Sequence, residues 1–594
     1  MRTKQKIRRP LLAVAICLLL CLLIAWVMTA PWRTGPEQTG PGTTTSDGTS
    51  VPEPDLPREV SKEAVLAALY EADISTLQAA MEGGLVTSEE LTAYYLERIE
   101  ACNEPYNCFI TLCDDALETA RARDADRADG TAKGALWGIP VVVKDNIHVL
   151  GYKTTNGYKL SASKVSATDA AVVKALKEAG AVIIGKANMS TAAQSARTSI
   201  SLAVGETKNA YCTWLAAGGS SGGSAVAVSL NFAAASLGTD TNSSLRVPAV
   251  LNGCVSLRCT YGKISTEGVI RLNKSRDIPG AITRTVYDQA LMLDVLTGNK
   301  YEYAKNLDAN ALQGVRLGVI KELTYNRSGT DAEVAAAFER AIEELKACGA
   351  EVVEVSIPNI LSLSQASLGG NAEAPKTAVY NAYKKAAEKY DVDAMIFPTY
   401  LSAPIYSGTD DNGKKWDAQA QSFINNCYAL GPSAKMPEMS VLIGTHSRGA
   451  GIGMEIAALR DSEQLLLNLA YSYTQKYDYR TLPDGAPNHY ADCFEDDIAA
   501  LLAEGAIRET IAPEVPESSV PAEPESSEPA GTGTTVSSGT ETSPETSVPA
   551  DAPQDPVTSA EPVPDEPKAG AGSTIWYSIT VAVVVAISAA LLFL

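Results

Sequence analysis

The chain has 594 residues and a net charge of −21. That length allows one large domain or two smaller ones. The acidic balance argues against nucleic acid as a partner, because a phosphate backbone is bound mainly by basic side chains. Part of the acidic excess lies in residues 513–568, where Lys568 is the only basic residue.

The N-terminus combines a basic flank with an apolar run. Basic residues crowd residues 1–10, and an apolar run extends from Leu11 to Ala30. About 20 residues cross a bilayer core, and the basic flank places the N-terminus inside. Residues 1–30 are therefore expected to be a signal anchor, or a signal peptide cut near Ala30. Residues 31–60, rich in Pro, Gly and Thr, are expected to form a linker.

A globular composition begins near Val60, and we expect one large domain over 61–495. Its first part has the periodicity of amphipathic helices, with Ser88 starting one of them. The predicted helices are Ser61–Tyr70, Ser75–Met81, Ser88–Ala101 and 115–128.

A β-branched run from Gly138 predicts a buried strand that ends at Lys144. Burial disfavours the ammonium form, so a buried lysine can act as a base near neutral pH. A lysine that reaches the surface is the alternative at this point.

Helices and strands alternate in the rest of the domain, which indicates an α/β layer fold. The predicted helices are Asp169–Glu178, 331–347 and Glu463–Tyr477. The predicted strands are Ala181–Lys186, 314–320, 351–356 and Ala394–Pro398.

Two clusters of hydroxyl side chains flank one apolar run. Gly218–Ser224 places hydroxyls among four glycines, Ala225–Leu237 reads as one buried apolar element, and Gly238–Arg246 brings further hydroxyls. Glycine lets a backbone come close to another group, so such a loop can also cradle an anion. The two clusters suggest two walls of one site, although two ordinary Gly/Ser loops remain possible.

Together these residues resemble the amidase signature family over roughly 62–490. The matching stretches are Gly218–Ser224, Gly238–Ala249, Val143–Asn146, Leu257–Ser265 and Pro279–Val286. The resemblance implies an α/β amidase-signature fold, with a mixed central β-sheet wrapped by helices in a single large catalytic domain. It also implies a Ser–Ser–Lys triad with Ser244 as nucleophile, Ser220 as bridging serine on a cis peptide, and Lys144 as base.

The implied reaction converts a carboxamide to a carboxylate plus ammonia or an amine, through an acyl-enzyme. Serine is a poor nucleophile until its proton is removed, which is the task expected of Lys144. The backbone amides of Thr241, Asn242, Ser243 and Ser244 are expected to form the oxyanion hole. Supporting roles are expected for Ser221, Asp240 and Arg246. No metal or organic cofactor is required, and the expected substrate is a small-molecule or peptide amide.

Two departures from the family pattern bear on substrate choice. The family usually has Gly-Gly before the nucleophile, where this chain has Asn242-Ser243. Side chains there are expected to narrow the pocket or alter the backbone. Residues 359–378 also look short for the helical segment that commonly covers the substrate funnel.

Other functions remain open on the sequence. Gly219–Gly223 fits the G-x-S-x-G elbow of α/β-hydrolases, with Ser221 as nucleophile and His446 as its histidine. A surface binding protein on an inactive amidase scaffold is suggested by the Asn242-Ser243 change. The amidase subunit of a tRNA-dependent amidotransferase shares the signature, but export across a membrane would separate it from charged tRNA.

The C-terminal region is expected to anchor the domain outside the cell. We expect a last helix at 496–512, a disordered acidic stalk at 513–573, and a transmembrane segment at 574–594. A degenerate cell-wall sorting signal is the alternative for the last segment. The predicted location is the cell membrane, with the catalytic domain extracellular.

The sequence holds eleven cysteines and no C-x-x-C spacing, which gives metal sites little support. The scattered cysteines are typical of small buried apolar residues, and the sequence leaves disulfides open.

Overall fold

The computed structural model describes residues 61–324, 327–485 and 487–488. The predicted membrane-length segments, the linker, the last helix and the acidic stalk lie outside these residues, as does the predicted domain end at 495. Within the described part, no helix is both long and apolar enough to cross a membrane.

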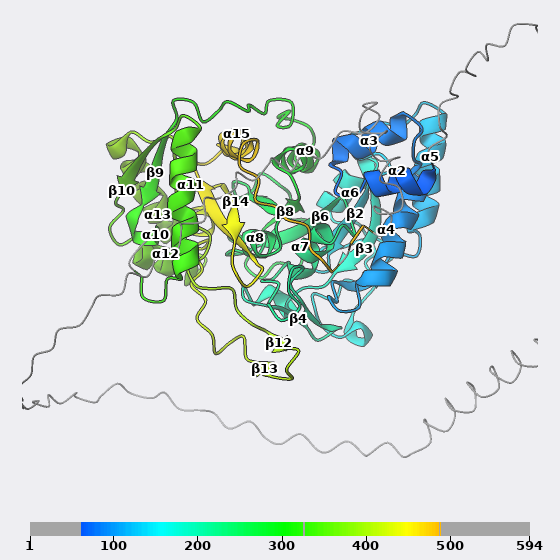
Figure 1. Cartoon of the computed structure of the whole chain (residues 1–594), viewed down its shortest axis with the longest axis horizontal. Helices are drawn as coiled ribbons and strands as arrows, with labels where there is room; N and C mark the ends of the chain where they lie inside the picture. Colours follow the sequence, from blue (N-terminus) through cyan, green and yellow to red (C-terminus); the bar gives the residue numbers. More distant parts are fainter. Residues whose placement is uncertain (1–60, 325–326, 486, 489–594) are drawn as a thin grey trace, which may run out of the picture. The chain divides into compact units, whose positions relative to one another are not determined.

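A mixed sheet of eleven strands forms the centre of the described part (Figure 1). From one edge to the other the order is β1-β3-β2-β6-β8-β7-β14-β15-β11-β9-β10. The strands are β1 (Phe109–Leu112), β2 (Pro140–Lys144), β3 (Val182–Ala187), β6 (Ala235–Asp240), β7 (Val255–Arg258), β8 (Ile278–Thr283), β9 (Arg316–Ile320), β10 (Glu351–Val355), β11 (Ala394–Pro398), β14 (Glu438–Thr445) and β15 (Gly451–Ala457). Two short hairpins, β4 (Ser199–Ser201) with β5 (Gly205–Thr207) and β12 (Gly408–Thr409) with β13 (Lys415–Trp416), lie apart from it.

The sheet holds two groups of parallel strands, and its edge strand β1 pairs antiparallel with β3. Strands β3, β2 and β6 run parallel, as do β11, β9 and β10. The strands between these groups pair antiparallel. This mixed sheet confirms the fold class predicted from the sequence.

Helices cover the sheet, with α2 to α5 at one end and α10 to α13 at the other (Figure 1). The helices are α2 (Lys62–Ala68), α3 (Ile74–Glu82), α4 (Ser88–Cys102), α5 (Ala116–Ala128), α6 (Ala171–Glu178), α7 (Gly222–Ser229), α8 (Arg246–Leu251), α9 (Val286–Leu296), α10 (Lys321–Thr324), α11 (Ala332–Ala347), α12 (Ile360–Leu368), α13 (Glu373–Tyr390), α14 (Gly431–Ala434) and α15 (Glu463–Thr474). The 360–390 region holds two of them, so the segment expected to be short at 359–378 opens a longer helical pair.

The apolar run between the two hydroxyl clusters is two elements, not the single element expected. Helix α7 ends at Ser229, and β6 begins at Ala235. The chain reverses at Asn231, whose φ is 55°, a left-handed conformation that asparagine adopts more readily than most residues. All residues of α7 and β6 are buried, because α7 packs on β2, β6 and β8. An all-round apolar pattern therefore concealed the break.

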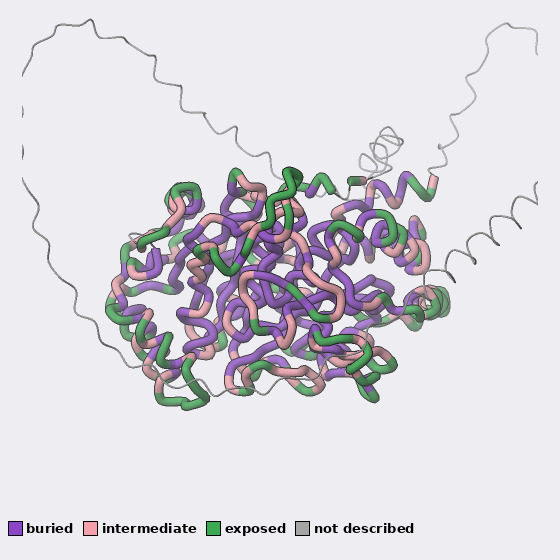
Figure 2. The backbone as a smooth tube through the Cα atoms, turned by 90° about the horizontal axis from the view of Figure 1, so that it is seen from below, coloured by how far each residue is buried: buried purple, intermediate pink, exposed green. Residues whose placement is uncertain are grey.

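Buried residues fill the interior of the described part, and exposed residues lie on its outer helices and loops (Figure 2). The described cysteines are free thiols, and all of them except Cys212 are buried. For this part of the chain, the prediction that cysteines serve as small buried residues is confirmed.

Candidate active site

Lys144 ends β2 at the carboxyl edge of the parallel strands and is completely buried. Its Nζ lies 2.7 Å from Ser220 Oγ and 2.8 Å from Ser221 Oγ. A third contact joins Nζ to Thr239 Oγ1 at 2.9 Å. The lysine predicted from the β-branched run therefore points into the glycine-rich loop and not to the surface.

Burial lowers the pKa of Lys144 to about 7. The carboxylates of Asp240 and Asp277 act in the opposite direction but do not outweigh burial. A large share of the amine is therefore uncharged near neutral pH, and an uncharged amine can take a proton from a neighbouring hydroxyl.

The glycine-rich loop packs against backbone and is not an open anion cradle. The Gly219–Ser220 peptide is cis, as the family resemblance implies. A Cβ on Gly219 would lie 2.4 Å from the carbonyl oxygens of Ser195 and Thr198. The amides of Gly219 and Gly223 donate to the carbonyls of Ala196 and Asn188, and the Gly222 amide donates to Ser199 Oγ. These amides are used within the protein, so the loop does not offer them to a phosphate.

Ser244 lies between β6 and α8. Its hydroxyl makes no hydrogen bond within the described residues, and no bond joins it to Ser220 Oγ there. The backbone amides of Thr241, Asn242, Ser243 and Ser244 also find no acceptor in the described part of the chain. Free amides beside a free hydroxyl are the arrangement that an oxyanion hole requires.

The two serine loops meet over Gly238. A Cβ added to Gly238 would lie 2.8 Å from Ser221 Oγ and 2.7 Å from Leu245 Cδ2. Ser221 follows Ser220 and Leu245 follows Ser244, so the loops that carry the two candidate catalytic serines meet at the same point of β6. Ser221 also accepts from the Thr239 amide at 3.3 Å, in keeping with a supporting role.

A buried cluster of charges lies under the Ser244 loop. Arg246 Nη1 is 2.9 Å from Glu438 Oε1 and 3.2 Å from Glu455 Oε2. Asp240 contacts Arg246 Nε at 3.3 Å and Arg258 Nη1 at 2.9 Å. Burial raises the pKa of Glu438 and of Glu455, which favours keeping a proton in the cluster.

These contacts agree with the supporting roles predicted for two residues. Asp240 accepts from the Leu245 amide, and Arg246 donates to the Asn242 carbonyl. The sequence did not single out Arg258, Glu438 or Glu455. The available signal was an ionisable residue inside an apolar strand, because such a residue needs a buried partner.

Asn242 and Ser243, which replace the usual glycines, differ in their surroundings. Ser243 is buried, and its Oγ accepts from Asn425 Nδ2 at 2.9 Å. Asn242 is partly exposed, but its Oδ1 is enclosed and has no partner in the described residues. Asn425 was not anticipated from the sequence, because it lies 182 positions from Ser243.

The α/β-hydrolase alternative does not fit the geometry. His446 Nε2 lies 3.3 Å from Asp331 Oδ1, and the His446 Nδ1 accepts from the Arg448 amide. In the described residues, Ser221 Oγ forms hydrogen bonds with Lys144 and Thr239. No group of three or more His, Cys, Asp or Glu side chains in the described residues could hold a metal ion.

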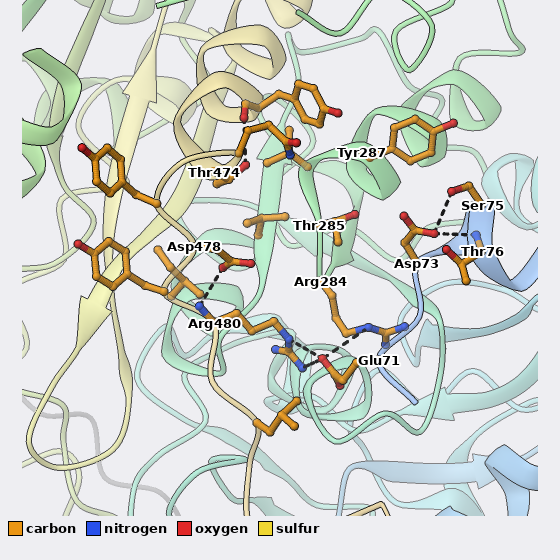
Figure 3. A pocket seen from close by; sticks show the side chains of 18 of the residues that line it. Glu71, Asp73, Ser75, Thr76, Arg284, Thr285, Tyr287, Thr474, Asp478 and Arg480 are labelled. Carbon is orange, nitrogen blue, oxygen red and sulfur yellow. Dashed lines mark hydrogen bonds and ion pairs between the residues drawn. The ribbon is translucent and has the colours of Figure 1, made fainter. Parts of the chain in front are cut away.

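A cavity of about 800 Å³ is lined by Glu71, Arg284 and Arg480, among others (Figure 3). Arg284 lines it and follows β8, whose end pairs with the amino end of β6. Lys144 lies at the opposite, carboxyl edge. In the cavity wall Arg480 and Glu71 form an ion pair at 2.7 Å, beside Arg284 (Figure 3). The cavity is therefore separate from the candidate active site.

The Amidase family model matches residues 90–379. A glutamyl-tRNA(Gln) amidotransferase subunit from Halorhodospira halophila is 30% identical over 493 residues, which cover 70% of this chain and 100% of that protein. The corresponding subunit from Chromobacterium violaceum is 32% identical over 483 residues, 69% of this chain and 99% of its own. This chain belongs to the amidase family.

Solved structures place the amidase among enzymes of the same fold. Peptide amidase from Stenotrophomonas maltophilia is 28% identical, with a TM-score of 0.60 over 70% of this chain and 99% of that one. A glutamyl-tRNA(Gln) amidotransferase subunit from Thermotoga maritima is 26% identical, with a TM-score of 0.54 over 67% and 94%. The resemblance seen in the sequence is confirmed, and the chain is an enzyme of the amide-cleaving class.

Proposed function

We propose that this amidase hydrolyses a carboxamide through an acyl-enzyme on Ser244. The observation that carries the proposal is the buried amine of Lys144, 2.7 Å from Ser220 Oγ, with its pKa lowered to about 7. Such an amine is a competent base at neutral pH.

In the proposed reaction, Lys144 takes the proton of Ser220, and Ser220 takes the proton of Ser244. Ser244 Oγ bonds to the amide carbon, and the carbonyl oxygen becomes an oxyanion held by the amides of 241–244. Ser220 then passes that proton to the nitrogen and recovers its own from Lys144, the C–N bond breaks, and ammonia or an amine leaves. Water cleaves the acyl ester in the second half of the reaction.

Substitution of the triad tests this function in the full-length protein. Ser244→Ala and Lys144→Ala are each expected to lower amide hydrolysis by roughly 10³-fold or more, because the proton chain acts as a unit. A fluorophosphonate probe is expected to label wild type at Ser244. The controls are Ser161→Ala and Lys133→Ala, both at exposed positions.

Two results would contradict the proposal. Turnover at the wild-type rate in Ser244→Ala would remove Ser244 as nucleophile. A folded wild-type protein that neither hydrolyses amides nor accepts the probe would support the inactive-scaffold alternative.

The comparisons favour an amidotransferase subunit over a stand-alone extracytoplasmic amidase. Relatives of that name align over nearly their whole length at 30–32% identity. Peptide amidase is also similar in structure, so a stand-alone amidase remains the second candidate. As such a subunit, the chain would act together with other proteins and release ammonia for transfer.

Capture of the tagged full chain from its native cells distinguishes an amidotransferase subunit from a stand-alone amidase. Amidation of glutamyl-tRNA(Gln) by the captured material, lost in Ser244→Ala, supports the subunit function. Amide hydrolysis by the captured chain without amidation supports the stand-alone amidase.

The location is a proposal that rests on segments 1–30 and 574–594, which lie outside the described residues. For the stand-alone amidase, and not for the amidotransferase subunit, we propose attachment to the cell membrane with the catalytic domain outside. Protease added to intact cells should then digest the domain. Full protection until the cells are lysed would contradict this location and favour the amidotransferase setting.

A further inference from the structure

The cavity of about 800 Å³ has no part in the chemistry proposed for Ser244. Its described lining comes from three stretches of chain, 70–76, 284–287 and 471–482, together with Val255 of β7 and Leu442 of β14. Its volume lies in the range of pockets that hold small organic molecules.

Much of the described cavity wall is apolar or aromatic. Four aliphatic side chains and five tyrosines line it, Leu442 and Tyr287 among them. Aliphatic side chains favour a ligand with an apolar body, and the faces of aromatic rings attract cations.

The two arginines in the wall direct most of their donors into the protein. Arg284 donates to three main-chain carbonyls. Arg480 donates to two main-chain carbonyls and to Glu71. An anionic ligand would therefore compete with the main chain and with Glu71 for these guanidinium groups.

Asp73 and Asp478 each use one carboxylate oxygen within the protein. Asp73 Oδ1 accepts from the Thr76 amide at 2.7 Å, and Asp478 Oδ1 accepts from the Arg480 amide at 2.9 Å. No donor in the described residues reaches the second oxygen of either aspartate. In Figure 3 the two aspartates flank Thr285, and on each the oxygen without a dashed line is turned towards it. These two oxygens can accept from a charged donor in the cavity.

Negative charge is in excess around the cavity. Among the described lining residues, three carboxylates, including that of Glu71, face two guanidinium groups. Next to Asp73, Asp288 accepts from the Ile74 amide. Burial, followed by the negative charge of Asp73, raises the pKa of Asp288 to about 7. A cation near Asp73 and Asp478 would offset this excess.

We propose that the cavity binds a small organic cation, an ammonium group on an apolar body, with Asp73 and Asp478 as its charged contacts. The apolar body lies against the aliphatic and tyrosine side chains of the wall. This binding site does not depend on the proposed hydrolysis at Ser244, so either proposal can fail without the other.

Three ligands that share one ring test the proposal on the full-length protein at neutral pH. They are cyclohexylammonium, neutral cyclohexanol and anionic cyclohexanecarboxylate, and binding is measured by isothermal titration calorimetry. Cyclohexylammonium is expected to bind saturably to one site per chain. The other two are expected to bind at least about tenfold more weakly, because they lack the charge that the aspartates recognise.

Asp73→Asn and Asp478→Asn locate the site. Each is expected to weaken cyclohexylammonium binding by about tenfold or more. Asparagine also caps helices, and it keeps an oxygen that can accept from the Arg480 amide. Asp461→Asn is the control, because Asp461 is 74% exposed and lies outside the cavity lining. Urea unfolding shows whether each variant is folded, and if one of the two does not fold, the other carries the comparison.

Four results would overturn the proposal. In wild type, these are no saturable binding of cyclohexylammonium, equal binding of cyclohexanol, or tighter binding of cyclohexanecarboxylate. The fourth is a dissociation constant for cyclohexylammonium in folded Asp73→Asn and Asp478→Asn that matches the value in Asp461→Asn, because the cation would then bind elsewhere.

Discussion

At the scale of single residues, burial of Lys144, and not a dedicated charged partner, lowers the pKa of the proposed base. Burial alone lowers the pKa of Lys144, while Asp240 and Asp277 raise it. The active form is the uncharged amine. We therefore expect kcat/KM to fall about tenfold per pH unit below about pH 7 and to level off above it. The measurement is kcat/KM for an amide from about pH 5 to about pH 9.

The variant Asp277→Asn tests whether the titration of Lys144 causes this pH dependence. The substitution removes a carboxylate that raises the pKa of Lys144, so the rising limb should move to lower pH. A limb that moves to higher pH, or a wild-type rate that is flat around neutrality, would show that another group limits the reaction.

At the scale of elements, the start of α7 depends on a glycine with no room for a side chain. A Cβ on Gly223 would lie 2.4 Å from Asn188 O and 2.6 Å from Cys108 O. Alanine is the better helix former, but the clash with fixed backbone should outweigh that gain. We expect Gly223→Ala to reduce the free energy of unfolding by about 1–3 kcal/mol, measured by urea denaturation.

Gly370→Ala is the control, because nothing lies within 4 Å of a Cβ at that exposed position. It should leave the free energy of unfolding within about 0.5 kcal/mol of wild type. Equal free energies of unfolding for Gly223→Ala and Gly370→Ala would mean that the backbone around Gly223 can shift to accept a Cβ.

The sequence predicted the helices and strands whose residue patterns lie within one short stretch of the chain. The helix that begins at Ser88 and the strand that ends at Lys144 both lie where periodicity and β-branching placed them. The division between α7 and β6 was missed, because complete burial removes the polar face that marks a period. In the site, Lys144 and Ser220 were predicted to meet, and they do.

The remaining site contacts come from long-range pairing that no local pattern shows. Glu438 and Glu455 reach Arg246 only because β14 and β15 lie in the same sheet. Asn425 reaches Ser243 through a loop that carries no motif. The catalytic roles themselves stay predictions until the triad variants are measured.

At the scale of the whole described part, Arg480 joins distant segments of the chain. Its guanidinium contacts Glu71 between α2 and α3 (Figure 3). It also donates to the Gly253 carbonyl at 2.7 Å and to the Ser229 carbonyl at 3.1 Å. Arg480→Met leaves Glu71 and both carbonyls without this donor. We expect a loss of about 3–5 kcal/mol in the free energy of unfolding, measured by urea denaturation.

Arg121→Met is the control for Arg480→Met. Arg121 forms an ion pair with Glu89 at 2.8 Å, but its side chain is 59% exposed. Its loss should cost less than about 1 kcal/mol. Hydrogen exchange should quicken near 478–485 in Arg480→Met and stay unchanged there in Arg121→Met. Similar losses in the two variants would mean that Arg480 does not hold these segments together.

The complete burial of Lys144 also affects how such an enzyme would be detected by chemical labelling. Acylating reagents that modify amines need both an unprotonated nitrogen and a path to it, and Lys144 offers only the first. Lysines such as Lys174, 71% exposed, should consume the reagent while hydrolysis continues. A survey that ranks lysines by their reactivity would therefore miss Lys144, on which the proposed turnover depends. A serine-directed probe would instead detect the enzyme through Ser244.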